Sequence, residues 1–321
     1  MRQTARSVAR CFVTRELPGD ALERLRAEHE VEIWGEPRPP ARASLLTGAV
    51  EAEGLLSLLT DPIDAELLSQ LPNLRAISNY AVGTDNVDLD AATARGIPVG
   101  HTPEVLTDAT ADLAVALMLA IARRLSEAED VVREGRWGPW RPDFLLGRDL
   151  HGSAVGIVGG GRIGQAVARR VEGFDCRVLL AGRDRAELER VLAEADFVSV
   201  HTPLTEATRG LIGDAELRAM KPTAYLVNTA RGPIVESAAL ARALAGGWIA
   251  GAALDVTDPE PLPADHPLLD APNLLVVPHI GSATHSTREA MAAIAVDNLR
   301  AALAGERMRH CANPEVYERH G

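Results

Sequence analysis

The sequence predicts an α/β protein of two domains, each built around a parallel β-sheet. The chain has 321 residues, and a domain typically holds about 100–200. Short apolar runs rich in β-branched residues alternate with helical patterns along most of the chain, as expected for parallel strands joined by crossover helices. Near the middle, one such run leads directly into a glycine-rich turn and a helix.

The first hundred residues alternate strand-like and helix-like segments. The expected strands are 8–14, 31–34, 54–60, 74–83 and 97–103, and helical patterns cover 21–28 and 63–71. Three of these strands end in small polar or glycine-rich tails, at Thr60, Ser78–Gly83 and Gly100–Thr102. Ligands of open parallel sheets bind outside such carboxyl ends. Gly83 would let the backbone approach an anion closely.

The next fifty residues change in character. Glu104–Leu125 is rich in Ala, Leu and Met, which predicts one long buried helix that crosses between the domains. Residues 125–150 place Trp137, Trp140 and Phe144 among Gly, Pro and Arg. Aromatic residues in an irregular segment commonly form a subunit contact. We expect a dimerisation arm here, with a structural lid as the alternative.

The glycine-rich turn predicts a dinucleotide site. Val155–Val158 has the pattern of a strand buried on both faces, and Gly159, Gly161 and Gly164 follow at G-x-G-x-x-G spacing. The first glycine allows the tight turn, the second admits a pyrophosphate, and the third lets helix pack on strand. The helix that starts at Arg162 offers free N–H groups and a positive dipole end to the phosphates.

The end of the following strand, Cys176–Ala181, bears on the choice of coenzyme. NAD enzymes usually place an acidic residue near this point to bind the ribose 2′-OH. Here Gly182 and Arg183 follow the strand, and a guanidinium suits a phosphate dianion. Arg185 could add positive charge. The pair predicts NADP(H), with NAD(H) possible if Asp184 turns back to the ribose.

Four further strands of the second half end in residues that can carry chemistry. His201, Arg231, Asp255 and His279 each follow an apolar run, in FVSVHTP, AYLVNTARG, AALDV and LLVVPH. Carboxyl ends of parallel strands meet at one edge of a sheet, so these side chains are expected to gather beside the coenzyme phosphates. The helical pattern at 287–304 is expected to return to the first domain.

Composition and charge limit the kinds of binding partner and cellular compartment that the sequence predicts. The formal net charge is −12 and the pI is near 5.3, so no global positive field favours nucleic acid or an anionic membrane. Three separated cysteines show no metal spacing and fit free thiols of a cytoplasmic protein. No metal is expected.

Two stretches of the sequence bear on targeting and membrane insertion. The N-terminus faintly resembles a transit peptide because of Arg2, Arg6, Arg10 and Arg15, but residues 8–14 fit a strand better. The apolar stretch 113–121 is too short to span a bilayer.

Successive blocks of the sequence resemble one family over essentially the full chain. ISNYAVGTDNVDLDAATARGIPVGHTP, TDATADLAVALMLA, GIVGGGRIG, NTARGPIVE, ALDVTDPEPLP and VVPHIGSAT are similar, in order, to motifs of the D-isomer-specific 2-hydroxyacid dehydrogenases. The AGR strand end and the Trp-containing arm resemble the glyoxylate/hydroxypyruvate reductase branch.

The resemblance implies a fold and a domain division. It implies two Rossmann-like domains, one flavodoxin-like and one NAD(P)-binding, with a cleft between them. Residues 1–103 and 287–321 would form the substrate-binding domain, and 104–286 the coenzyme domain. A homodimer in the cytoplasm is expected.

The resemblance also implies roles for individual residues. His279 would act as general acid, Glu260 would orient it and keep it protonated, and Arg231 would clamp the substrate carboxylate. His201 is the rival general acid by position, while the family pattern places it at the nucleotide. The implied substrate-binding residues are Leu59, Val82, Gly83, Arg231, His279 and Ser282. The implied coenzyme-binding residues are Thr107, Gly159, Gly161, Arg162, Ile163, Gly164, Gly182, Arg183, Asp184, His201, Thr202, Pro203, Thr208, Thr229, Ala230, Asp255, His279 and Gly281.

The activity implied is NADPH-dependent reduction of glyoxylate to glycolate and of hydroxypyruvate to D-glycerate. The alternatives within the family are a broader 2-oxoacid reductase and a D-3-phosphoglycerate dehydrogenase. From a different class, a dinucleotide-sensing binding protein similar to corepressors built on this scaffold also remains open, because a fold does not establish an activity.

Overall fold

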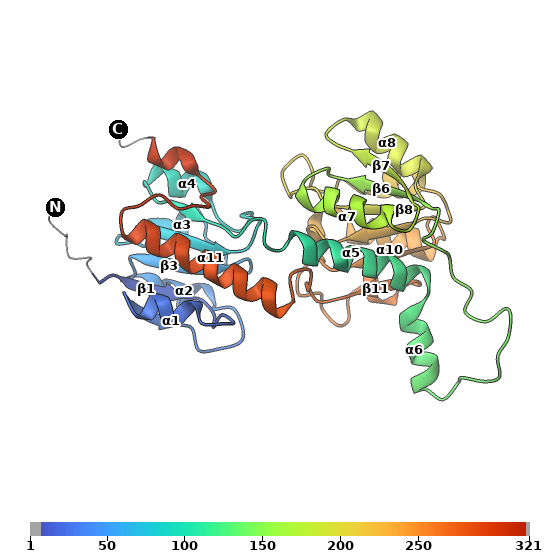
Figure 1. Cartoon of the computed structure of the whole chain (residues 1–321), viewed down its shortest axis with the longest axis horizontal. Coiled ribbons are helices and arrows are strands. Elements are labelled where there is room, and N and C mark those ends of the chain that lie inside the picture. Colours follow the sequence, from blue (N-terminus) through green and yellow to red (C-terminus); the bar gives the residue numbers. More distant parts are fainter. Residues whose placement is uncertain (1–7, 319–321) are drawn as a thin grey trace. The chain divides into compact units, whose positions relative to one another are not determined.

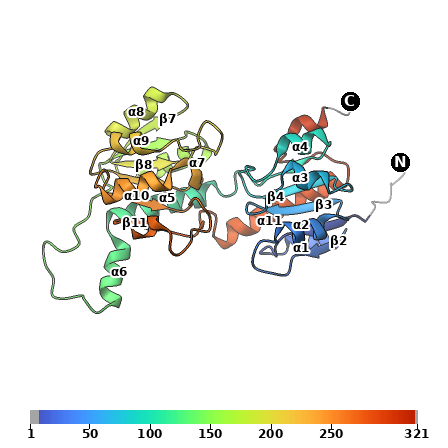
Figure 2. The same ribbon diagram turned by 180° about the vertical axis from the view of Figure 1, so that it is seen from behind.

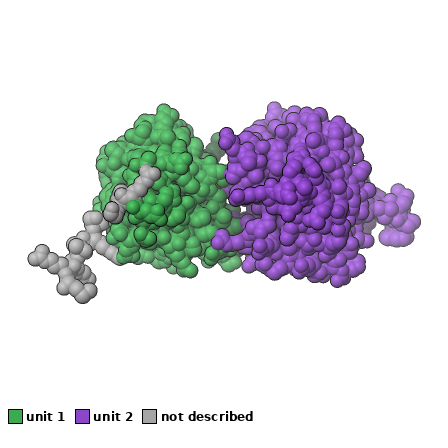
Figure 3. Space-filling view, turned by 90° about the horizontal axis from the view of Figure 1, so that it is seen from above, with its two compact units in different colours: residues 1–106, 283–321 green, residues 107–282 purple. Residues whose placement is uncertain are grey.

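The computed structural model describes residues 8–318, so Arg2 and Arg6 lie outside the described part of the chain. The chain forms two compact units (Figure 3): unit 1 contains residues up to 106 and from 283 onward, and unit 2 contains 107–282. The boundaries expected from the sequence lie at 103/104 and 286/287. Each unit has its own parallel sheet, which confirms the predicted fold class.

Unit 1 is built on a five-stranded parallel sheet of order β2-β1-β3-β4-β5. Its strands are β1 (Arg10–Val13), β2 (Glu30–Ile33), β3 (Gly54–Leu58), β4 (Ala76–Tyr80) and β5 (Val99–Gly100), and its helices are α1 (Ala21–Arg26), α2 (Arg42–Ala49), α3 (Ala65–Ser69), α4 (Leu89–Ala94) and α11 (His285–Leu303). Alternate strand residues face opposite sides. Phe12, Leu55 and Ile77 share a core with residues of α2 and α3, whereas Gly54 faces Leu299 and Leu303 of α11. Helix α11 therefore covers one face of this sheet, and α2 and α3 cover the other (Figures 1 and 2).

Unit 2 is built on a six-stranded parallel sheet of order β11-β10-β9-β8-β6-β7. Its strands are β6 (Ala154–Val158), β7 (Arg177–Ala181), β8 (Phe197–Val200), β9 (Tyr225–Asn228), β10 (Gly251–Leu254) and β11 (Leu274–Val276), and its helices are α5 (Thr107–Ala122), α6 (Leu125–Arg133), α7 (Arg162–Glu172), α8 (Arg185–Glu194), α9 (Asp214–Ala219) and α10 (Ser237–Ala245). Helices α5 and α7 pack on one face, and α8, α9 and α10 share the other core. The strand order reverses between β6 and β8, the position where open α/β sheets bind ligands.

The long helix predicted for Glu104–Leu125 is wrong at both ends. Helix α5 covers Thr107–Ala122, and Arg124, with φ of +52°, separates it from α6. A non-glycine residue in this left-handed conformation interrupts α-helical hydrogen bonding. No residue type at this point signals the break, because Arg is a good helix former.

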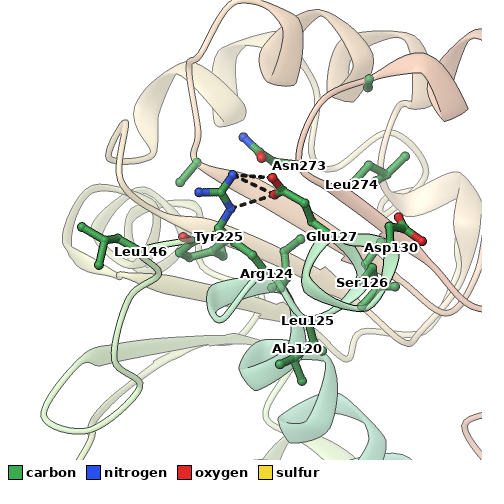
Figure 4. A pocket seen from close by; sticks show the side chains of 14 residues that line it. Ala120, Arg124, Leu125, Ser126, Glu127, Asp130, Leu146, Tyr225, Asn273 and Leu274 are labelled. Carbon is green, nitrogen blue, oxygen red and sulfur yellow. Dashed lines mark hydrogen bonds and ion pairs between the residues drawn. The ribbon is translucent and has the colours of Figure 1, made fainter. Parts of the chain in front are cut away.

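The segment after α6 contains no helix or strand up to β6. In it Trp137 and Trp140 are 72% and 85% exposed. A pocket of about 520 Å³ lies at its base (Figure 4), where Arg124 pairs with Glu127 beside Leu146 and Tyr225. Tyr225 is the first residue of β9, so this pocket lies at the amino edge of the sheet.

The same amino edge carries the chain's single lysine. Lys221 Nζ lies 3.1 Å from Asp196 Oδ1, and Asp196 also accepts the N–H of Ala154 at the start of β6. The hydrogen bonds and charges of these partners lower the pKa of Asp196 against the opposing effect of burial, the largest single influence. Among the described residues, no helix is both long enough and apolar enough to cross a membrane.

Candidate active site

The turn between β6 and α7 has the geometry of a phosphate site. Gly159 has φ of +100°, and a Cβ there would lie 2.6 Å from the backbone N of Thr202. A Cβ on Gly164 would lie 2.1 Å from the carbonyl oxygen of Gly159. Both positions therefore require glycine. Around Gly161 the space is open, and this N-cap residue, a glycine, has no side chain with which to cap α7. Open space at a helix N-terminus fits a pyrophosphate.

The loop after β7 is arranged differently from the expectation. Asp184 caps α8, accepting the N–H of Ala186, so in this structure it does not turn back toward Gly182. Arg185 pairs with Glu189 and Glu216, at 3.1 and 2.7 Å. Arg185 therefore has two carboxylate partners in this structure, and its contribution to coenzyme binding stays a prediction. Arg183 is exposed and makes no ion pair within residues 8–318.

His279 and Glu260 form a close pair in unit 2. His279 Nδ1 lies 2.6 Å from Glu260 Oε1, and each side chain is partly accessible, at 24% and 34%. Burial, the largest influence, raises the pKa of Glu260, but the hydrogen bond and charge of His279, with help from Arg231, hold it below its ordinary value. The carboxylate is thus ionised and holds Nδ1–H, which leaves Nε2 as the reactive nitrogen.

The backbone around His279 is fixed by two side chains. His279 has φ of +53°, a conformation that costs energy for a non-glycine residue. The carboxylate of Asp255 accepts the N–H groups of Ile280 and Gly281, at 2.6 and 2.9 Å, and Thr110 donates to the carbonyl of Gly281. Burial raises the pKa of Asp255 against these donors, which lower it. Asp255 therefore holds the loop that carries the histidine.

Arg231 follows β9 in a braced turn. The side chain of Asn228 accepts the N–H of Ala230 and donates to the carbonyl of Arg231, at 3.0 and 2.9 Å. A Cβ on the next residue, Gly232, would collide with the carbonyl of Thr257, and the N–H of Thr257 lies 3.3 Å from Glu260 Oε2. Close packing of these two loops brings Arg231 near enough to Glu260 to affect its pKa.

His201 lies at the end of β8 among neutral partners. Its Nε2 is 2.8 Å from Ser199 Oγ and its Nδ1 is 3.5 Å from Thr229 Oγ1. Burial lowers the pKa of His201 to about 4. An imidazole without a carboxylate partner stays neutral at pH 7, which argues against His201 as the general acid.

The implied substrate-binding residues Leu59, Val82 and Gly83 belong to unit 1. Each carbonyl of the loop 81–83 accepts a hydrogen bond: Ala81 from Thr102 N–H, Val82 from His101 Nδ1 and Gly83 from the Asn79 amide. Within the described residues, the N–H groups of Val82 and Gly83 donate to no protein acceptor. A loop with engaged carbonyls and available N–H groups is suited to an anion.

The remaining implied residues lie in unit 2. Thr107 begins α5, Ser282 follows the His279 loop, and Thr208 Oγ1 bonds the carbonyl of Pro203, closing the loop after β8. Sequence reasoning missed the supporting side chains of Asn228, Thr110 and His101. Their positions carry no motif of their own.

Comparison with known proteins identifies the family. Residues 115–281 match the model of the D-isomer specific 2-hydroxyacid dehydrogenase NAD binding domain. The glyoxylate reductases of Korarchaeum cryptofilum and Thermococcus litoralis are 48% and 45% identical to the chain, covering 96% and 95% of it and 96% and 97% of their own lengths.

Solved structures agree with the sequence comparison. A protein of Thermus thermophilus is 50% identical with a TM-score of 0.90, covering 94% of this chain and 99% of its own. The NADPH-dependent glyoxylate/hydroxypyruvate reductase of Sinorhizobium meliloti, solved with NADP and malonate, is 35% identical with a TM-score of 0.84, covering 96% and 98%. The chain belongs to the D-isomer-specific 2-hydroxyacid dehydrogenase family and is an NAD(P)-dependent oxidoreductase of that family.

Proposed function

We propose that the chain reduces glyoxylate to glycolate and hydroxypyruvate to D-glycerate, with NADPH as the preferred coenzyme. The observation that carries this proposal is the His279–Glu260 pair with Arg231 close by, which unites a proton donor, its counter-charge and a carboxylate-binding group. The names of the similar proteins support the substrate: the curated relatives are glyoxylate reductases.

In this proposal different residues bind the substrate and transfer the proton. Arg231 binds the substrate carboxylate as a two-pronged donor, and the N–H groups of Val82 and Gly83 add to that binding beside Leu59. A nicotinamide coenzyme, when bound, would supply the hydride that the 2-oxo carbon accepts. His279 gives the proton at Nε2 to the carbonyl oxygen, and Glu260 keeps the imidazolium oriented and stabilised.

The proposed coenzyme site uses the turns that follow the strands of unit 2. The glycine turn at 159–164 binds the pyrophosphate, and the loops at His201–Pro203, Thr229–Ala230 and Gly281 border the nucleotide. Asp255 holds the His279 loop, and in this proposal its carboxylate also contacts the carboxamide of the nicotinamide. Gly182 and Arg183 receive the 2′-phosphate, which is the basis for preferring NADPH. The NADPH dependence of the Sinorhizobium meliloti reductase supports this choice.

A substrate panel run with both coenzymes tests the proposal. Glyoxylate, hydroxypyruvate, 3-phosphohydroxypyruvate and larger 2-oxoacids are compared by kcat/KM with NADPH and with NADH. We expect glyoxylate and hydroxypyruvate to give the highest kcat/KM, and NADPH to give higher values than NADH. If 3-phosphohydroxypyruvate gives the highest kcat/KM, the chain is a phosphoglycerate dehydrogenase instead. If no substrate is turned over although the coenzyme binds tightly, the chain is better explained as a dinucleotide sensor.

The Arg183→Ala variant tests the coenzyme assignment separately. Loss of a cation facing a phosphate should raise the KM for NADPH about tenfold or more, while the KM for NADH changes little. Equal increases in the KM for NADPH and for NADH would show that Arg183 does not select between the coenzymes.

We also propose that the chain forms a homodimer through residues 125–150. The exposed Trp137 and Trp140 support this, because large exposed aromatic side chains commonly mark protein interfaces. Sedimentation of the W137A/W140A double variant should show a loss of dimer, and unchanged sedimentation would exclude the arm. The cytoplasmic location expected from the free cysteines stays a prediction.

A further inference from the structure

The carboxylate of Glu187 lies directly at the carboxyl end of β7. Glu187 is in the first turn of α8, and its Oε2 accepts the backbone N–H of Gly182 at 2.8 Å. A Cβ built on Gly182 would lie 3.3 Å from the same oxygen. In the dinucleotide fold this strand end is the place where the adenosine ribose and its 2′-substituent are recognised.

The charged side chains near Gly182 differ in the partners that they contact. Arg185 is held by Glu189 and Glu216, and Asp184 caps α8. Arg183, next to Gly182 in sequence, is exposed, and Glu187 is the carboxylate that contacts the backbone N–H of Gly182 itself. Glu187 makes no ion pair within the described residues. A positive group, Arg183, and a negative group, Glu187, therefore both lie beside the strand end at Gly182.

We propose that Glu187 is a specificity-determining residue that opposes Arg183 in the selection of coenzyme. A carboxylate accepts a hydrogen bond from a ribose 2′-hydroxyl, but a 2′-phosphate offers it no proton and brings like charge. Glu187 would thus weaken the binding of NADPH and leave NADH unaffected or slightly favoured. The proposal rests on the coenzyme site proposed above and adds the residue that limits its selectivity.

A purely structural role for Glu187 is the competing explanation. Acidic side chains in the first turn stabilise helices through the dipole and by accepting free N–H groups. Replacement by glutamine separates the two roles, because the amide oxygen still accepts the N–H of Gly182 while the charge is removed. The Glu187→Gln variant is therefore more informative than an alanine variant.

The test is a direct measurement of coenzyme binding without substrate. Dissociation constants of NADPH and NADH are determined by coenzyme fluorescence for the wild type and for Glu187→Gln. We expect NADPH to bind about five- to tenfold more tightly to the variant, as expected for removal of one nearby like charge, and NADH to change less than about twofold. The NADPH gain should shrink at high salt, because exposed charges are screened.

Glu194→Gln is the matched control. It removes one carboxylate from the other end of α8, where Glu194 pairs with Arg177, and both dissociation constants should stay unchanged. Thermal melting of each variant shows that the fold is retained. An unchanged NADPH constant in Glu187→Gln, or equal shifts for both coenzymes, would overturn the inference.

The measurement also distinguishes this inference from the proposed preference for NADPH. If the wild type binds NADH more tightly, that preference is wrong, but a selective gain for NADPH in Glu187→Gln would still support the role of Glu187. If the wild type prefers NADPH and the variant shows no selective gain, the preference stands and the role of Glu187 is lost.

Discussion

The two units share a strand order and differ in the loops at their strand ends. Unit 1 has the order β2-β1-β3-β4-β5, and unit 2 has the equivalent order β7-β6-β8-β9-β10 with β11 added. In unit 1 the strand ends lead to a loop whose carbonyls are all engaged. In unit 2 they lead to a glycine turn, a histidine–glutamate pair and an arginine. The comparison teaches that the sheet supplies positions, whereas the first residues beyond each strand supply the chemistry.

The largest predicted effect belongs to unit 2. Replacing His279 with Gln removes the proton donor, and kcat for glyoxylate should fall about a thousandfold. Coenzyme affinity, measured by fluorescence, should stay within about twofold. His151→Gln is the control, because that exposed histidine pairs only with Asp175 among the described residues. Full activity in the His279 variant would break the assignment of chemistry to unit 2.

Removing the partner of His279 should have the next largest effect. In Glu260→Gln the imidazolium loses its counter-charge, and kcat should fall about ten- to a hundredfold. Against the opposing effect of burial, the contacts of Glu260 lower the pKa of its carboxyl, so the wild-type rate should fall at acidic pH as this group is protonated, and that fall should disappear in Glu260→Gln. The full pH–rate profile checks this, since a variant with reduced kcat but an unchanged acidic fall would show that Glu260 acts only through packing.

The corresponding test in unit 1 should affect binding rather than chemistry. His101→Ala removes the donor to the Val82 carbonyl, so the KM for glyoxylate should rise about tenfold with kcat nearly constant. The amide of His101→Asn should restore part of the affinity. His29→Ala is the control: this unit 1 histidine accepts the N–H of Ala9, and its loss should lower stability without raising KM. A fall in kcat without a rise in KM for His101→Ala would show that this part of unit 1 affects chemistry and not substrate binding.

The smallest effect concerns stability. The pKa of His201 is lowered from 6.5 to about 4 by burial, so the neutral form is favoured in the folded state. The unfolded chain binds this proton as pH falls through 6.5 while the folded chain does not. Stability associated with neutral His201 is therefore complete above pH 6.5 and lost progressively toward pH 4, by roughly 2–3 kcal/mol.

Urea unfolding at pH 7 and pH 4.5 measures this loss. The decrease between the two pH values should be smaller in His201→Gln than in the wild type, because glutamine does not titrate. The same decrease in both proteins would show that His201 is already accessible to protons in the folded state.

Much of the fold could be predicted because its signals are local. Each apolar run expected to be a strand overlaps one of the strands β1–β11, since buried parallel strands are short, apolar and bounded by turns. The glycine turn was equally clear, because Gly159 and Gly164 meet steric requirements that no other residue satisfies. The order of strands and helices then placed His279 and Arg231 at one sheet edge.

The features that could not be predicted depend on contacts between distant residues. The pairing of Arg185 with Glu216 spans two elements, and no spacing rule reports it. The carboxylate of Glu187 reaches back across the strand-to-helix turn, where a motif search looks only for the residue at the strand end. The break at Arg124 falls at a residue type of high helix propensity, so propensity does not predict it.

The placement of the single lysine has a practical consequence for experiments on this enzyme. Lys221 precedes β9 while Arg231 follows it, so the lysine lies at the opposite edge of the sheet from the reactive groups. An amine-reactive fluorophore has one side chain to label in this chain. Labelling would release the Asp196 contact of Lys221, and Asp196 would keep its bonds to Arg148 and Ala154. The protein thus carries a built-in attachment point for surface immobilisation or single-molecule spectroscopy, away from its chemistry.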